Sequence, residues 1–299
     1  MDAVIVVDDA STDDTADVVG RIALEYSGRV VVKRLERNYG PGAARNIGLG
    51  LSTAPWVAVL DADDFFLQGR MEQLLSYADD NDFIADDLLQ VDESDDGRQS
   101  RLFEALVDPR QLNLEQFVLG NLSRPGRLRK ELGFLKPLMR RSFLDQHSLR
   151  YDESLRLGED YALYARALAM RARFIVIPAC GYVSVVRSDS ISGRHSLADL
   201  ERFRDVNDEL SGIPGLGARE KRALRCHYRS VDARAQWVAV ILATKARSPS
   251  NFLAPFFRSW TVSRFLLENL MQQLYLRGGR LLSKLRRRTS DAIKQSLRA

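Results

Sequence analysis

Three clusters of carboxylates lie at the ends of expected strands or at the start of an expected helix. They are the pair Asp8 and Asp9, the segment Asp61-Ala62-Asp63-Asp64, and the pair Glu159 and Asp160. Two acids that stand two positions apart beyond a strand can share a hard divalent cation, which also binds substrate phosphates. Asp61 and Asp63 have this spacing, which favours Mn²⁺ or Mg²⁺ as cofactor. Acidic turns are common in proteins, so this pair alone is weak evidence for a metal site.

The elements that would position these acids alternate between strand and helix over the first 90 residues. Apolar β-branched runs predict strands at residues 4–7, 30–35 and 56–60, and helices are expected after Ser11 or Thr12 and from Pro41. This alternation predicts an α/β fold with a mostly parallel central sheet flanked by helices. Ligands gather at the carboxyl ends of strands in such sheets, which is where the acids stand.

The second half of the sequence becomes progressively helical. Residues 92–109 are polar and acidic and are expected to form a surface loop or an excursion between sheet elements. Helices are expected at 114–120, 141–146 and 159–172, with a strand at 134–139 and a β-rich stretch at 174–186 that Pro178 interrupts. Beyond Ser196 the pattern is helical almost throughout. We therefore expect a catalytic domain at 1–196 and an α-helical, basic C-terminal extension at 197–299.

Composition excludes several classes of protein. With 45% hydrophobic and 28% charged residues, the chain is neither disordered nor fibrous. No apolar run approaches the roughly 18 residues of a membrane-spanning helix, and no secretion signal is expected at the N-terminus. The two cysteines, Cys180 and Cys226, cannot make a disulfide framework, so we expect a cytoplasmic protein.

Charge is distributed unevenly along the chain. From Gln273 to the end there are eight Lys or Arg and one Asp, a net of +7, whereas the whole chain carries +4. Apolar side chains accompany this tail: Phe252, Leu253, Phe256, Phe257, Leu266, Leu267, Leu270, Leu274, Leu281, Leu282 and Leu285. Such a basic helix can lie on an anionic membrane face as a peripheral contact. The alternatives are packing on the catalytic domain or in a homodimer. No nucleic acid partner is expected, because no nucleic-acid-binding module accompanies the charge.

The motifs, taken in order, resemble those of the family 2 glycosyltransferases with the GT-A fold. The matching segments are VIVVDDASTDDT at 4–15, NYGPGAARNIGLGL at 38–51, WVAVLDADDF at 56–65 and GED at 158–160. The resemblance covers about residues 2–196, and the set is specific although each piece alone is not. Together with residues 187–195, the chain is similar to bacterial exopolysaccharide transferases of the succinoglycan-building kind. That family normally begins one strand and one helix earlier, so we expect this chain to be N-terminally truncated relative to it.

The resemblance implies a nucleotide-binding role for four residues. Asp9 or Asp8 would hydrogen-bond the nucleotide base, typically uracil. Arg45 and Asn46 match the family's A-R-N segment, in which the arginine lines the nucleotide pocket. The alternatives are a turn or helix-capping acid for the aspartate pair and an ordinary surface salt bridge for the arginine.

The resemblance also implies metal and sugar contacts. Asp61, followed by Ala62, would lie near the ribose and the metal, and Asp63 would bind the metal itself. Asp64 has a weaker match. His195 follows the acidic pair at the distance where many GT-A enzymes place a histidine that completes the metal shell, although an ordinary loop histidine is the equal alternative.

Asp160 matches the family's catalytic base, and Glu159 would orient the base or the acceptor. A helix N-terminus favours the carboxylate form, which is the form that accepts a proton. The implied reaction is inverting: the deprotonated acceptor hydroxyl attacks the anomeric carbon opposite the nucleotide diphosphate, whose charge a metal offsets. The alternative is a pair of helix-capping acids.

We therefore expect an inverting glycosyltransferase that moves a sugar from a nucleotide sugar, with UDP as the expected carrier, to a glycan or lipid-linked acceptor. Its place would be bacterial exopolysaccharide biosynthesis at the inner face of the cell membrane. One alternative is a catalytically inactive scaffold at the membrane. Another is a sugar-phosphate nucleotidyltransferase, against which the lack of a Gly-rich N-terminal loop counts.

Overall fold

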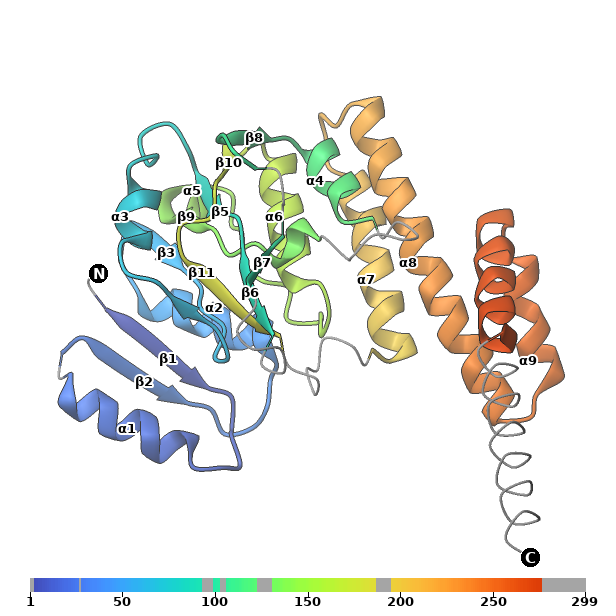
Figure 1. The fold of residues 1–299 in the computed structure, drawn as a ribbon, viewed down its shortest axis with the longest axis horizontal. Helices are drawn as coiled ribbons and strands as arrows, with labels where there is room; N and C mark the ends of the chain where they lie inside the picture. Colours follow the sequence, from blue (N-terminus) through green and yellow to red (C-terminus); the bar gives the residue numbers. More distant parts are fainter. Residues whose placement is uncertain are drawn as a thin grey trace, which may run out of the picture. The chain divides into compact units, whose positions relative to one another are not determined.

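The computed structural model describes residues 3–26, 28–92, 99–102, 106–122, 131–186 and 195–275 (Figure 1). The chain forms two compact units, Met1–Ser230 and Val231–Ala299. The first unit extends beyond the expected boundary near residue 196. The reason is that helix α7 (Leu197–Ser211) packs on α6 (Glu159–Ala169), with the rings of Phe203 and Tyr161 in edge-on contact.

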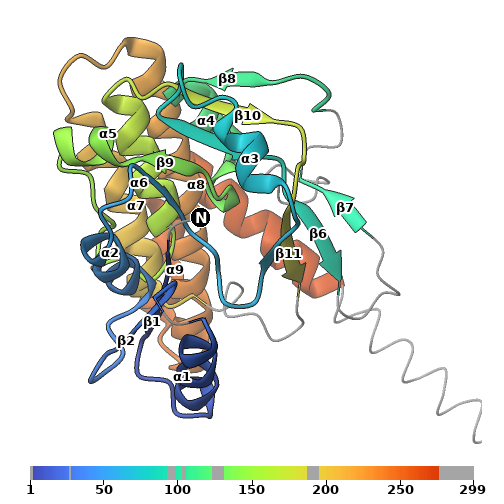
Figure 2. The same cartoon turned by 90° about the vertical axis from the view of Figure 1, so that its left-hand side faces the viewer.

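The N-terminal region of the first unit consists of β1 (Val4–Asp8), α1 (Thr15–Glu25) and β2 (Val30–Arg34). The two strands pair in parallel, and α1 packs against β2 while α2 (Pro41–Leu51) packs against β1 (Figure 2). Helix α1 follows Asp14, later than the expected cap at Ser11 or Thr12, and the Ser11 amide donates to the carboxylate of Asp8. Asp8 is the one fully buried residue of the two strands.

A five-stranded sheet forms the centre of the first unit. Its order is β3 (Trp56–Ala58), β9 (Leu138–Arg140), β5 (Phe83–Asp86), β10 (Phe174–Ile177) and β8 (Arg110–Leu112). Strands β5 and β10 run parallel, but β9 enters between β3 and β5 in the opposite direction, and β8 is also antiparallel. The expected α/β fold is confirmed: β3, β5 and β10 run in one direction, and β9 and β8 are the antiparallel members of the sheet.

The first unit also contains a four-stranded sheet. Its order is β4 (Phe65–Phe66), β11 (Tyr182–Val186), β6 (Leu89–Asp92) and β7 (Gln99–Arg101). Strand β7 falls within residues 92–109, where a surface loop or an excursion between sheet elements was expected. It pairs antiparallel with β6, and the adjoining Leu102 is buried, so this apolar side chain anchors the segment to the sheet.

Aromatic side chains fill the core between the central sheet and α6. Phe83 and Phe174 stack with ring centroids 5.5 Å apart, and Phe117 from α4 (Leu114–Gly120) and Tyr164 from α6 pack around them. Figure 1 shows α6 between this sheet and α7. Helices α3 (Arg70–Leu75) and α5 (Arg141–Gln146) and the short 3₁₀ turn η1 (Leu132–Phe134) complete the described part of this core.

The second unit is helical. It contains the latter half of α8 (Ala218–Lys245), α9 (Pro249–Leu253), the 3₁₀ turn η3 (Ala254–Phe257) and a helix over residues 260–275. Its core is built from Ala233, Val240, Val262 and Leu266, with Trp237, Phe252, Phe256 and Phe265 packed around them. Over the described residues of the chain, no helix combines the length and hydropathy that crossing a bilayer requires.

Candidate functional site

Four of the expected site residues come together around a lysine to which the sequence motifs do not point. Lys136 Nζ lies 2.9 Å from Asp61 Oδ2 and 2.5 Å from Asp160 Oδ2. Arg45 connects the same two acids, with Nη2 2.7 Å from Asp61 Oδ1 and Nη1 3.3 Å from Asp160 Oδ1. Arg45 Nη1 also lies 2.7 Å from Glu159 Oε1. Three acids and two cations therefore share one largely buried site.

Helix α2 positions Arg45 in this site. The helix starts at Pro41 after Gly40, whose φ of 94° suits a residue without a Cβ. The neighbouring side chain of Asn46 accepts a hydrogen bond from the Tyr151 amide and donates one to the Tyr151 carbonyl, both at 2.9 Å. The guanidinium of Arg45 lies over the Tyr151 ring, 5.4 Å from its centroid. Asn46 therefore holds the segment on which Arg45 rests, a structural role beside the nucleotide role that the resemblance implies.

Glu159 and Asp160 occupy the first turn of α6, as expected. Gly158 precedes them with φ 76°, and a Cβ at this position would come within 2.2 Å of the Phe203 ring. The carboxylate of Asp160 also accepts a hydrogen bond from the Tyr164 hydroxyl at 3.4 Å. Asp160 is therefore held by Lys136, Arg45 and Tyr164 at the N-terminus of α6.

A buried ion pair fixes the backbone of Lys136. Arg70 donates to the Lys136 carbonyl at 2.7 Å and to Asp86 Oδ1 from Nε and Nη2 at 2.9 and 2.7 Å. The other oxygen of Asp86 accepts three backbone amides, those of Cys180, Gly181 and Tyr182. The sequence signal for Lys136 is a cation inside an otherwise apolar stretch at 134–139, because a buried lysine has to be paired.

Ion pairing also sets the charge of the site. Burial opposes the charged form of Lys136, but Asp160 and Asp61 outweigh burial and raise the pKa of the ammonium. Burial acts to raise the pKa of Asp61, but Lys136 and Arg45 hold this pKa below its ordinary value. The lysine is therefore protonated and Asp61 is ionised at neutral pH.

The other members of the segment 61–64 lie in different environments. Asp64 accepts hydrogen bonds from the Tyr182 hydroxyl at 2.7 Å and the Val185 amide at 3.0 Å, and burial raises the pKa of its carboxyl group. Ala62 and Asp63 are exposed. Within the described residues, Asp63 makes no hydrogen bond or ion pair. Asp64 therefore ties the segment before β4 to β11, whereas the carboxylate of Asp63 is exposed to solvent.

The expected metal ligands are not gathered into one group. In the described ranges, no three His, Cys, Asp or Glu side chains are close enough to hold a metal ion, so Asp61, Asp63 and His195 do not form a shell. Both oxygens of Asp61 contact cations, Arg45 and Lys136, and its place on the metal stays a prediction. A magnesium-type ion keeps several waters and takes one or two carboxylates plus substrate phosphates. The exposed carboxylate of Asp63 fits that smaller requirement.

Asp8 and Asp9, the expected nucleotide-base acids, both bind nearby backbone. Asp9 accepts the amides of Tyr39 at 2.8 Å and Gly40 at 2.7 Å. Asp8 is buried, and hydrogen bonding from Ser11 lowers the pKa of its carboxyl group. This geometry matches the alternative in which the pair are turn acids, because both carboxylates brace the loops around β1 and the start of α2.

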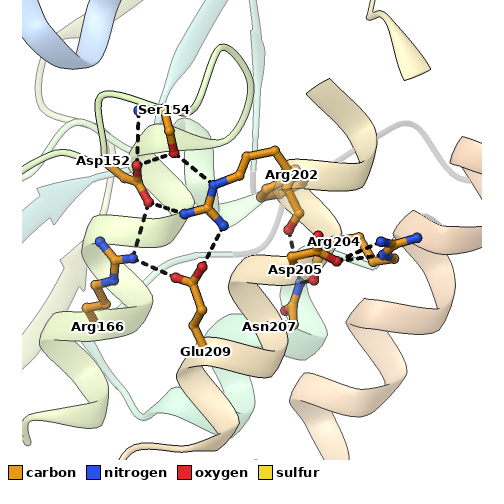
Figure 3. A network of polar contacts seen from close by, with 9 residues as sticks. Asp152, Ser154, Arg166, Arg202, Arg204, Asp205, Asn207 and Glu209 are labelled. Atoms are coloured by element: carbon orange, nitrogen blue, oxygen red, sulfur yellow. Dashed lines mark hydrogen bonds and ion pairs between the residues drawn. The ribbon is translucent and has the colours of Figure 1, made fainter. Parts of the chain in front are cut away.

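An ionic network anchors the segment that leads into the acidic pair (Figure 3). Asp152 Oδ2 accepts from Arg202 Nη2 at 2.6 Å and from Arg166 Nη2 at 3.3 Å. Both arginines also contact Glu209 on α7, at 2.6 and 3.1 Å, and Arg202 donates to Ser154 Oγ at 2.8 Å. The network ties the loop before α6 to α7 and so restricts the position of the residues that follow it.

The chain is similar to known proteins in sequence and in fold. Residues 2–143 match the family model described as Glycosyl transferase family 2. The chain is 49% identical over 232 residues to the succinoglycan biosynthesis protein ExoU of Rhizobium meliloti (77% of this chain, 67% of that protein). It is 40% identical over 287 residues to the succinoglycan biosynthesis protein ExoO of the same organism (94% and 79%). The crystal structure of S. aureus TarS 1-349 in complex with UDP-GlcNAc has a similar fold, with TM-score 0.57 and 17% identity over 84% of this chain and 80% of that one.

Proposed function

The chain belongs to glycosyl transferase family 2, and we propose that it is an inverting enzyme that uses a nucleotide-diphosphate sugar as donor. The observation that carries this proposal is the shared site in which Lys136 and Arg45 bridge Asp61 and Asp160. In this site a donor-side acid and a candidate base are held at a fixed spacing. Such preorganisation is what positions two reactants for a displacement.

Asp160 is the proposed general base. Its side chain lies in a largely buried site and is held by contacts from two cations and a tyrosine. In the proposed step, Asp160 accepts the proton of the acceptor hydroxyl while the oxygen attacks the anomeric carbon and the bond to the diphosphate breaks. Glu159 orients Arg45 through its 2.7 Å ion pair.

Lys136 is proposed as a positioning residue for this reaction. Its ammonium contacts Asp61 and Asp160 at once, so neither carboxylate can turn away without leaving a buried positive charge uncompensated. The Arg70–Asp86 pair fixes the backbone of Lys136 against the central sheet. The lysine in turn fixes the positions of both acids.

A divalent cation, when bound, would be held by Asp63 and the donor phosphates and would offset the charge that develops on the leaving diphosphate. Arg45 lies on the same side as Asp61 and supplies a fixed positive charge to that part of the site. Its planar guanidinium suits phosphate oxygens.

We propose a UDP-linked donor and an exopolysaccharide acceptor, either a glycan or a lipid-linked oligosaccharide at the inner face of the cell membrane. The identity to two succinoglycan biosynthesis proteins supports the pathway class, and the fold shared with a protein crystallised with UDP-GlcNAc supports the donor class. The acceptor would bring the enzyme to the membrane as a peripheral protein.

A donor screen tests the proposal. Thermal unfolding with a panel of UDP-sugars should show a rise in melting temperature for the true donor, since a ligand that binds the native state stabilises it. Release of UDP from that donor, measured with Mn²⁺ present, should be lost in Asp160→Asn and reduced in Asp63→Ala. Absence of binding by every nucleotide sugar would favour an inactive scaffold, and pyrophosphate release from a nucleoside triphosphate would favour a nucleotidyltransferase.

A further inference from the structure

The helix over residues 260–275 is apolar on two opposite faces. One face, with Val262 and Leu266, is buried in the core of the second unit. The other face carries large apolar side chains that are between 55% and 83% exposed: Trp260, Leu267, Met271, Leu274 and Tyr275. A surface helix of a globular protein normally has one apolar face, which is buried, and polar residues on the opposite face.

The segment before this helix divides in the same way. Phe252 and Phe256 pack on the core, whereas Leu253 and Phe257 are 52% and 85% exposed. The sequence analysis counted all four among the apolar side chains of the tail without separating them. The structure separates them into an inner set and an outer set, and the outer set continues the exposed side chains of the following helix along the chain.

The outer residues of the helix form a stripe. Trp260, Leu267, Met271 and Leu274 are separated by seven, four and three positions, which places them on one side of a helix. Aromatic residues, Trp260 and Tyr275, stand at the two ends of the stripe. We call this surface the outer face. An exposed apolar surface of this kind marks an interaction site.

We propose that the outer face docks on a lipid bilayer that contains anionic phospholipid, with the helix lying in the plane of the interface. The positive charge of the C-terminal residues indicates an anionic partner. Residues 246–299 contain eleven Lys or Arg and two acidic residues, a net of +9, while the whole chain carries +4. An apolar helix face combined with a concentration of cations is the combination that binds anionic membrane surfaces.

The same charge disfavours a second copy of the chain as the occupant. A symmetric dimer through the outer face would join two chains whose residues 246–299 each carry a net charge of +9, and like charges oppose association. The outer face also has Trp and Tyr at its ends. These side chains favour the boundary between headgroups and hydrocarbon, where an apolar ring and a polar tip are both accommodated.

Membrane docking is independent of the proposed reaction, because no residue of the outer face belongs to the candidate site. Sedimentation of the full chain with vesicles is the direct test. Binding should be strong with phosphatidylcholine–phosphatidylglycerol vesicles and weak with phosphatidylcholine alone, and it should fall as salt is raised.

Two double variants with the same added charge separate the outer face from a general electrostatic effect. Leu267→Glu with Met271→Glu places two acids in the stripe, and Thr261→Glu with Gln272→Glu places two acids on exposed positions of the same helix that are not apolar. The first variant should lose vesicle binding by more than about tenfold, since two large side chains no longer enter the interface. The second should lose much less. Circular dichroism should show both variants to be folded.

Quenching of tryptophan fluorescence by brominated lipid supplies a positional readout. The native chain should be quenched on vesicles, and Trp260→Phe should remove most of this quenching while the vesicle-bound fraction changes little. Equal binding of the two double variants would overturn the proposal, as would failure of the native chain to bind anionic vesicles. A native dimer that becomes a monomer only in Leu267→Glu with Met271→Glu, with vesicle binding unchanged, would assign the outer face to a second copy instead.

Discussion

The N-terminal β1–α1–β2 region and the β5–β10–α6 region are both built from parallel strands and a helix, but they bury very different amounts of apolar surface. Helix α1 has no fully buried residue, and Leu24 and Val31 are 81% and 42% exposed. In α6, nine of eleven residues are buried, and every residue of β5 and β10 is buried. Folding free energy from burial is therefore concentrated in the second region.

The catalytic candidates follow this division. Asp160 stands on the buried helix α6, and Lys136 is fixed to the central sheet through the Arg70–Asp86 pair. In the N-terminal region, by contrast, Asp8 and Asp9 are used to brace their own loops. The group that must be placed accurately for chemistry therefore lies on a rigid, well-packed element.

The largest expected effect distinguishes the acids of the two regions. Asp160→Asn should lower kcat by about 10²–10⁴-fold, because the amide cannot accept the acceptor proton, while donor affinity changes little. Asp9→Asn should raise the KM for the donor by less than about tenfold, since its amide oxygen can still accept one of the two backbone hydrogen bonds. UDP release under steady-state conditions measures both. A larger loss from Asp9→Asn would place the essential acid in the N-terminal region.

The next prediction concerns stability. Phe83→Ala should lower the free energy of unfolding by about 3–5 kcal/mol, because the ring is fully buried among aromatic neighbours. Val31→Ala, at an exposed position of β2, should change it by no more than about 0.5 kcal/mol. Urea titrations followed by circular dichroism give both values. Equal losses would mean that the two regions share one core and that burial is not concentrated in the β5–β10–α6 region.

A smaller effect is expected at Lys136. Lys136→Met should lower kcat by about 10–100-fold with a lesser change in KM, because Asp61 and Asp160 lose the ammonium that spaces them. Lys136→Arg should restore part of the activity, since it keeps the charge. Lys33→Met, an exposed lysine on β2, is the matched control and should leave turnover unchanged. If Lys136→Arg were no better than Lys136→Met, the positioning role would be refuted.

The smallest expected effect is the dependence of stability on pH. Asp61, in the site, has a pKa held below its ordinary value of 3.8 by Lys136 and Arg45 against the effect of burial. A carboxyl group with a lowered folded pKa stabilises the native state fully above its unfolded pKa and loses that contribution as pH falls through the folded pKa. The free energy of unfolding should therefore decrease below about pH 4, and Asp61→Asn should make this decrease shallower. An unchanged slope in the variant would mean that other carboxyls dominate acid unfolding.

Local sequence signals predicted most of the elements. Pro41 marks the start of α2, Pro178 separates β10 from β11, and the apolar period of residues 114–120 matches α4. The direction and order of strands were not predictable in this way, because the insertion of antiparallel β9 depends on long-range pairing. Helix α1 starts later than expected, at Thr15, and the Asp8 carboxylate accepts the Ser11 amide in the turn before it.

The candidate site was predicted only in part. The resemblance grouped Arg45, Asp61 and Asp160, and these residues do share one site. Lys136 belongs to none of the matching motifs, and it lies directly before β9, the strand between β3 and β5 in the central sheet. The spacing of the acids could not show which of them bind a metal. In particular, it could not show that both oxygens of Asp61 contact Lys136 and Arg45.

Gly158 has a consequence for laboratory evolution of this protein. Its left-handed backbone and the Phe203 ring within 2.2 Å of any added Cβ leave no space for another amino acid. Libraries that randomise the acidic segment to change acceptor preference would therefore waste most of their members if this codon were included. Holding Gly158 and Phe203 constant, or exchanging them only as a pair, keeps the diversity in sequences that can still fold.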